Sequence, residues 1–286
     1  MIRRLVAMVL LALAPVACTS DEGAGPAGVG TEAATVTSAT STSIVGTTTS
    51  TSTTSSTTST SSPTTSTLPA DFLGEQVIGT SAGGLPITVS HRGTPGGTVV
   101  LVVGVIHGDE NAGLAVLDEL RTMALPHGID LWLMEAMNPD GYAADVRGNA
   151  NGVDLNRNFP HDWTPIAEPG DWQYSGAGPA SEPETQAFID FTEGLRPALT
   201  LWYHQDLYRV SPSDGPDGPL RRLYTEITGL PYETVSGGTY SGVAATWVRR
   251  SIPGAMSFII ELGPTLSVDE AVVHAGAVLA VAQKLL

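Results

Sequence analysis

Apolar and β-branched residues occur in short runs from residue 76 onward, and these runs predict alternating strands and helices. Residues 76–79 and 85–91 flank a Gly-rich turn and predict a hairpin. Residues 98–106 form a continuous apolar run, which is typical of a strand buried on both faces. Residues 110–123 have helical spacing, and residues 129–136 predict another strand. This order predicts a right-handed strand–helix–strand crossover.

The C-terminal half continues the alternation. Residues 181–195 predict a helix, and Glu184 follows Ser181 at the spacing of a capping box. Two strands and a closing helix are predicted at residues 198–203, 255–260 and 268–286. The sequence therefore predicts a single α/β domain over residues 71–286, with a mixed, largely parallel central sheet flanked by helices.

The N-terminus has a different pattern. Arg3 and Arg4 precede an apolar run, residues 5–17, that is too short to span a bilayer but fits a signal peptide. The small residues before Cys18 resemble a bacterial lipoprotein cleavage site. We therefore expect residues 1–17 to be a signal peptide and Cys18 to be lipidated. The alternative is an ordinary secretion signal with an incidental cysteine, and either one predicts export.

Serine and threonine dominate the segment that follows. They make up 28 of the 40 residues from 31 to 70. Such a segment has little apolar surface to bury and cannot offset the entropy cost of ordering. We expect residues 18–70 to form a disordered tether between the outer face of the cytoplasmic membrane and the folded domain.

The charge balance excludes one large class of partners. The chain has 13 Lys and Arg residues against 29 Asp and Glu residues, a formal net charge of −16. A surface of this sign repels phosphate backbones, so we expect no nucleic-acid binding. Cys18 is the only cysteine, which excludes an intramolecular disulfide and a thiolate metal cage.

Side chains that can bind a metal follow the predicted strands. His107 and Glu110 come after the run 98–106, and His204 comes after the strand predicted at 198–203. Ligands of open α/β sheets bind at the carboxyl ends of the strands. Two imidazoles and one carboxylate leave a zinc ion one open position, as in catalytic zinc sites. The alternative is that His107 and Glu110 only stabilise a strand-to-helix turn.

Glu261 is the fourth polar residue at a predicted strand end. It lies between an apolar strand and Leu262. Apolar surroundings raise the pKa of a carboxyl group and suit it to taking and returning a proton. The alternative is an edge carboxylate paired with an arginine.

Residues 147–160, RGNANGVDLNRNFP, are dense in planar polar side chains. Arginine binds carboxylates bidentately and stabilises oxyanions. With NPDG at 138–141, this segment resembles the zinc metallocarboxypeptidase family and, within it, the bacterial murein peptide amidases, which are γ-D-glutamyl-diaminopimelate amidases. The resemblance extends from about residue 98 to residue 261.

The resemblance implies a zinc carboxypeptidase-like fold with one Zn²⁺ per chain. The roles it implies are zinc ligation by His107, Glu110 and His204, carbonyl polarisation by Arg147, substrate-carboxylate binding by Asn156 and Arg157, proton transfer by Glu261, and closure over the substrate by Tyr240. Tyr232 competes with Tyr240 for the last role. The implied mechanism is attack of zinc-activated water on an amide, assisted by the glutamate.

The resemblance also places a specificity pocket. Ala245 and Thr246 would lie at its base, with Arg249 and Arg250 just beyond. The absence of an acidic residue here argues against substrates with C-terminal lysine or arginine. A substrate with a second carboxylate, such as a diaminopimelate peptide, is compatible.

The predicted function is therefore that of a carboxypeptidase or peptide amidase. It would hydrolyse an amide bond next to a carboxylate-bearing residue, in peptidoglycan stem peptides. One alternative is a zinc-dependent N-acyl amino acid deacylase of the succinylglutamate desuccinylase type, against which the NPDG segment and the export signal argue. The other is a non-catalytic cell-envelope binding lipoprotein, against which the complete set of polar site residues argues.

Overall fold

A six-stranded sheet forms the centre of the computed structural model, which describes residues 68–235, 237 and 240–286. Its strand order is β1-β2-β4-β3-β5-β6, and β4, β3, β5 and β6 run parallel, whereas β1 and β2 are antiparallel to their neighbours. The strands are β1 (Phe72–Thr80), β2 (Pro86–Gly93), β3 (Thr98–Val105), β4 (Ile129–Ala136), β5 (Leu199–Gln205) and β6 (Met256–Leu262).

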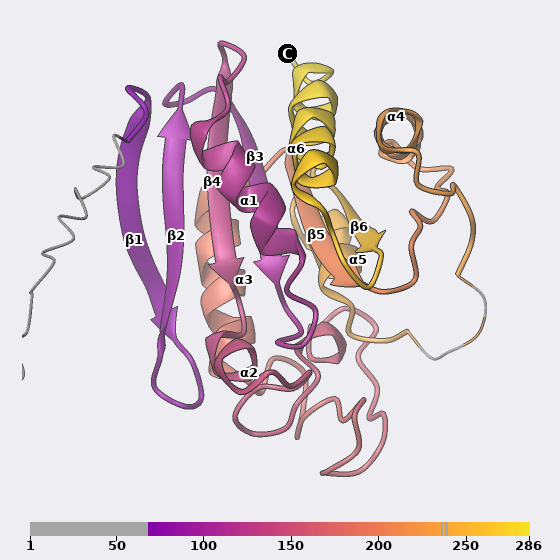
Figure 1. Cartoon of the computed structure of the whole chain (residues 1–286). Helices are drawn as coiled ribbons and strands as arrows, with labels where there is room; N and C mark the ends of the chain where they lie inside the picture. Colours follow the sequence, from indigo (N-terminus) through magenta and orange to yellow (C-terminus); the bar gives the residue numbers. More distant parts are fainter. Residues whose placement is uncertain (1–67, 236, 238–239) are drawn as a thin grey trace, which may run out of the picture. The chain divides into compact units, whose positions relative to one another are not determined.

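Helices cover both faces of the sheet (Figure 1). One face packs against α1 (Gly113–Thr122), α4 (Gly218–Thr228) and α6 (Val268–Gln283). The other face packs against α3 (Pro183–Leu195) and α5 (Ala244–Ser251). Two short helices, α2 (Pro139–Ala144) and the 3₁₀ helix η1 (Leu155–Arg157), lie in the loops beyond the carboxyl ends of the parallel strands (Figure 1).

Strand β3 shows why the centre of the sheet is so apolar. Val100 and Val102 belong to the core on one face, whereas Leu101 and Val103 belong to the core on the other, and all four are almost fully buried. Successive side chains of a strand point to opposite faces, so a strand covered on both sides needs an unbroken apolar run. Each such side chain contributes about 1.5–3 kcal/mol of burial free energy. The rigid strand fixes the loop that follows it.

The predicted fold class is confirmed, including the N-terminal hairpin and the β3–α1–β4 crossover. The helix predicted at 110–123 begins only at Gly113, because residues 107–112 form a loop. Strands β5 and β6 each extend two residues beyond their predicted ends. Helices α4 and α5 were not predicted.

The predicted capping box at the start of α3 is wrong. The residue before the helix is Glu182, with no side-chain capping bond, and Pro183 occupies the first turn. The Ser181 hydroxyl instead donates to Glu182 Oε1 at 2.8 Å and accepts from Asn158 Nδ2 at 2.9 Å. Ser181 therefore ties α3 to the 147–160 segment.

The signal peptide, Cys18 and all but the last residues of the tether lie outside the described residues and stay predictions. Among the helices that the structure describes, none combines the length and apolar character needed to cross a membrane.

Candidate metal centre and active site

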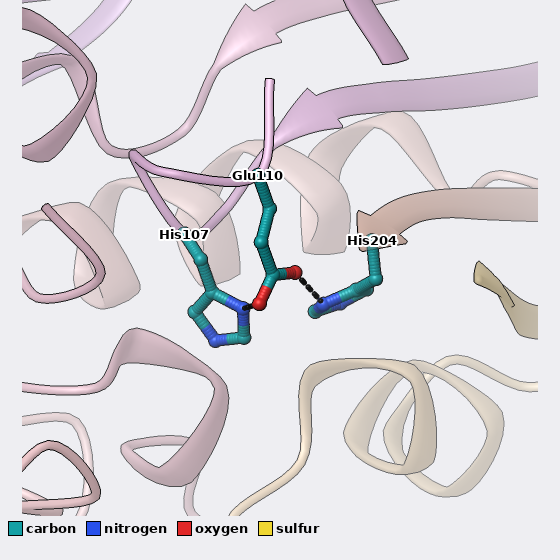
Figure 2. A group of neighbouring side chains, drawn as sticks. All are labelled: His107, Glu110 and His204. Atoms are coloured by element: carbon teal, nitrogen blue, oxygen red, sulfur yellow. Dashed lines mark hydrogen bonds and ion pairs between the residues drawn. The ribbon is translucent and has the colours of Figure 1, made fainter. Parts of the chain in front are cut away.

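Three predicted metal ligands converge at the carboxyl ends of β3 and β5 (Figure 2). His107 follows β3, Glu110 lies in the loop before α1, and His204 is the penultimate residue of β5. Glu110 Oε1 lies 2.9 Å from His107 Nδ1, and Glu110 Oε2 lies 2.8 Å from His204 Nδ1. One donor atom from each residue lies within 4.8 Å of the others. All three side chains are buried.

The chemistry of this donor set fits zinc. Burial would raise the pKa of the Glu110 carboxyl, but the adjacent His107 and His204 lower it well below its usual range. Glu110 is therefore a carboxylate, and zinc accepts nitrogen and oxygen donors of this kind. Three protein ligands leave a fourth position for water or substrate, as in catalytic zinc sites. The zinc prediction is confirmed by this geometry and by the family similarity described below.

Asp154 was not among the predicted site residues, yet it orients two of them. Its Oδ1 lies 2.9 Å from His107 Nε2, and its Oδ2 accepts from Arg147 Nε at 3.0 Å and from Arg147 Nη2 at 2.7 Å. A carboxylate only accepts, so His107 Nε2 carries a hydrogen toward Asp154, and Nδ1, which faces Glu110 and Arg147, is the nitrogen that would bind a metal. Burial would raise the pKa of Asp154, but His107 and Arg147 lower it below its usual range.

Glu261 lies beside His204, because the two residues are partners in the parallel register of β5 and β6. Its Oε2 is buried and has no hydrogen-bond partner among the described residues. Burial raises the pKa of its carboxyl group. An unpaired oxygen in these surroundings can accept a proton from a neighbouring group and return it. The alternative, a Glu261 carboxylate paired with an arginine, is not seen among the described residues.

Arg147 lies against the metal ligands. Its Nη1 donates to Glu110 Oε1 at 2.8 Å and lies 3.1 Å from His107 Nδ1. Its guanidinium carbon is 5.1 Å from the centre of the exposed Trp172 ring. The cation is thus fixed at the edge of the metal centre, where it can stabilise negative charge on a substrate oxygen.

The predicted carboxylate-binding residues lie next to the metal centre. Asn156 Nδ2 lies 3.4 Å from His204 Nε2, and Asn156 Oδ1 accepts from the backbone of Ala244 at 3.0 Å. Arg157 is buried, and its Nε has no partner among the described residues. The Arg157 guanidinium carbon lies 5.2 Å from the ring centre of Tyr240, which is 56% exposed. These positions suit the predicted substrate-binding roles, which stay predictions.

The structure differs from expectation at several positions. His204 and Glu261 lie within the ends of their strands rather than after them. Tyr232, the competitor of Tyr240, packs over Arg222 instead. His274, on α6, is buried beside Tyr224 and lies outside this site.

Comparisons with known proteins agree with this site. A family model described as zinc carboxypeptidase matches residues 68–207. Murein peptide amidase A of Vibrio campbellii is 30% identical over 185 residues, which cover 59% of this chain and 71% of that protein. Murein peptide amidase A of Escherichia coli strain K12 is 33% identical over 159 residues, or 51% of this chain, but the match spans only 64% of that protein's length. The crystal structure of a murein-tripeptide amidase from Escherichia coli matches with a TM-score of 0.60 and 28% identity, covering 77% of this chain and 93% of that one.

Proposed function

Because the chain belongs to the zinc carboxypeptidase family, we propose that it is a zinc-dependent hydrolase of peptide bonds. The bond it cleaves adjoins a residue with a free carboxylate, in peptidoglycan stem peptides. The observation that carries this proposal is the position of Glu261. Its unpaired carboxylate oxygen lies next to His204 of the metal centre, and Glu261 lines the same pocket as Tyr240, whose ring faces the Arg157 guanidinium.

Each residue has a part in this proposal. Asn156 and Arg157 bind the free carboxylate of the substrate and orient the adjacent amide. Glu261 takes a proton from the attacking water and passes it to the leaving amine. Arg147 holds the carbonyl oxygen as it becomes negative. Zinc, when bound, supplies Lewis-acid chemistry that lowers the pKa of water and polarises the carbonyl.

The names of similar proteins support the choice of substrate. Two of them are murein peptide amidases, and the crystal structure is that of a murein-tripeptide amidase. We propose further that residues 1–17 export the chain and that Cys18 anchors it by lipid to the outer face of the bacterial cytoplasmic membrane. This location would bring the domain to the cell wall.

The test is a hydrolysis assay with the purified full-length chain and one equivalent of zinc. The substrates are L-Ala-γ-D-Glu-diaminopimelate and an ordinary peptide with a free C-terminus, and mass spectrometry identifies the products. Release of diaminopimelate alone supports an amidase, whereas trimming of the ordinary peptide supports a general carboxypeptidase. No hydrolysis of either peptide by the zinc-bound protein contradicts the proposal.

A further inference from the structure

A pocket of about 260 Å³ is lined by Glu261 and by none of the three metal ligands. Tyr240 and Glu261 line it, and Val243 and Ile259 provide apolar wall. Ile259 and Glu261 point to the same side of β6, since they are two residues apart in a strand. A substrate residue held next to Glu261 would therefore extend its side chain along this wall.

Two arginines also line the pocket, and their surroundings differ. Arg221 of α4 is paired, because its Nε donates to Asp217 Oδ2 at 2.7 Å. Arg249 of α5 donates to the backbone oxygen of Ser257 at 2.7 Å and to the Thr246 hydroxyl at 3.0 Å. No carboxylate of the described residues forms an ion pair with Arg249.

The charges around Arg249 are mostly positive. Burial, followed by the nearby Arg221, lowers the pKa of Arg249, and Asp217 only partly opposes this. Arginine nevertheless stays protonated in proteins. A half-buried cation that no carboxylate contacts directly is costly, and an anion in the pocket would reduce that cost.

We infer that Arg249 is a specificity-determining residue that binds a carboxylate on the side chain of the substrate's C-terminal residue. The substrate class is then peptides that end in an amino-dicarboxylic acid, such as diaminopimelate or glutamate. The α-carboxylate would lie at Arg157 and the side-chain carboxylate at Arg249. Thr246 and Ser257 hold the Arg249 guanidinium in place for this contact.

Other side chains fit this pocket less well. A lysine or arginine side chain would bring a third cation next to Arg221 and Arg249 with no carboxylate beside it, whereas the ammonium group of diaminopimelate shares its carbon with a carboxylate. A purely apolar side chain would pack against Val243 and Ile259 but would leave the Arg249 charge without a carboxylate partner. A side chain with an apolar stem and a terminal carboxylate satisfies both parts of the pocket.

The inference rests on the proposed function, so its test uses two matched substrate pairs. L-Ala-γ-D-Glu-diaminopimelate and L-Ala-γ-D-Glu-L-Lys differ by one carboxylate at the end of the side chain. An ordinary peptide ending in Glu or Gln differs only in charge at that point. With the zinc-loaded full-length chain, we expect kcat/KM to favour the acidic member of the hydrolysed pair by about 10- to 100-fold, the effect of one charge-assisted hydrogen bond.

Variants then assign the preference to Arg249. In Arg249→Gln the ratio of kcat/KM values should fall toward one, whereas the neighbouring exposed Arg250, changed to Gln, should leave the ratio as in the wild type. Arg249→Glu should reverse the ratio in favour of the lysine peptide, a gain that misfolding cannot produce.

The outcomes separate the two proposals. If the chain hydrolyses both members of a pair equally well, the inference is overturned but the proposed function is not. The same holds if Arg249→Gln keeps the preference of the wild type. No hydrolysis of any of the four peptides overturns the proposed function, and the inference with it.

Discussion

Asp154 Oδ1 lies 2.9 Å from His107 Nε2, although the two residues are 47 positions apart in the sequence. The contact holds the imidazole by Nε2, so that His107 Nδ1 faces the metal centre. The same carboxylate holds Arg147 through two hydrogen bonds. One buried acid thus couples the metal ligand to the cation beside it.

The Asp154 contact predicts a loss of metal affinity on substitution. Asp154→Asn keeps the size of the side chain but removes its charge, so it should weaken zinc binding by about 10- to 100-fold. Competition with a chromophoric chelator measures this affinity. The exposed Asp118, changed to Asn, serves as control. Wild-type affinity in Asp154→Asn would show that the contact does not support the ligand.

Zinc binding should also stabilise the fold. His107, Glu110 and His204 all lie in the folded domain, so zinc should bind the native state in preference to the unfolded chain. At a free zinc concentration 100 times the Kd, this preference raises the unfolding free energy by about 2.7 kcal/mol, which corresponds to a rise in Tm of about 5–11 °C. Calorimetry before and after chelation measures the shift. It should vanish in His204→Ala and persist when the exposed His127 is changed to Ala. A full shift in His204→Ala would contradict the assigned site.

The position of Glu261 predicts that binding and turnover can be separated. Glu261→Gln has nearly the same shape but cannot take a proton, so kcat should fall by about 100- to 10,000-fold while zinc affinity is kept. Peptide hydrolysis and zinc content are measured on the same sample. The exposed Glu233, changed to Gln, should keep full activity. Substantial remaining turnover in Glu261→Gln would refute a proton-transfer role.

Gly108 allows the loops after β3 and β4 to touch. A Cβ at Gly108 would lie 1.9 Å from the backbone carbon of Gly141, a contact that no rotamer change can relieve. Gly108→Ala should therefore cost about 1–3 kcal/mol of unfolding free energy, and it should weaken zinc binding by moving His107. Urea unfolding measures the cost. Gly178→Ala adds the same methyl group where nothing lies within 4 Å, and should be nearly neutral. Equal effects of the two substitutions would contradict this account.

The fold and the main site residues could be predicted because their signals are local. The apolar run of β3 identifies a central strand, and polar residues at strand ends meet at one edge of a parallel sheet. The in-register pairing of His204 with Glu261 is the direct result. Helix α4 was missed although it is longer than α1, because its buried face includes Arg221 and Thr225 beside Leu220 and Tyr224, so apolar positions alone do not reveal it.

Side-chain partners at long sequence separation could not be predicted. Asp154 is one of several polar residues in its segment, and nothing in the sequence links it to His107. The charge balance of the pocket likewise depends on Asp217 pairing with Arg221 rather than with Arg249. Which side chains pair depends on the tertiary structure, and the hydrophobic periodicity of the sequence does not contain this information.

The burial of His274 predicts acid lability. Its Nδ1 lies 2.7 Å from the Tyr224 hydroxyl, which lies 3.0 Å from that of Tyr203. Burial lowers the pKa of His274 from 6.5 to about 4, although Glu270 partly opposes this. The unfolded chain therefore binds a proton more readily than the native state between these values. The unfolding free energy therefore has its full value, as far as His274 is concerned, above pH 6.5. It falls as the pH is lowered from 6.5 toward 4, by at most about 3 kcal/mol.

Urea unfolding at a series of pH values measures this loss. His274→Asn offers the Tyr224 hydroxyl an acceptor oxygen but does not titrate, so its unfolding free energy should change less between pH 6.5 and pH 4 than that of the wild type. The exposed His127, changed to Asn, is the matched control and should keep the wild-type pH dependence. If His274→Asn and the wild type lose the same free energy over this range, the acid lability comes from other groups, such as the carboxylates of the metal centre.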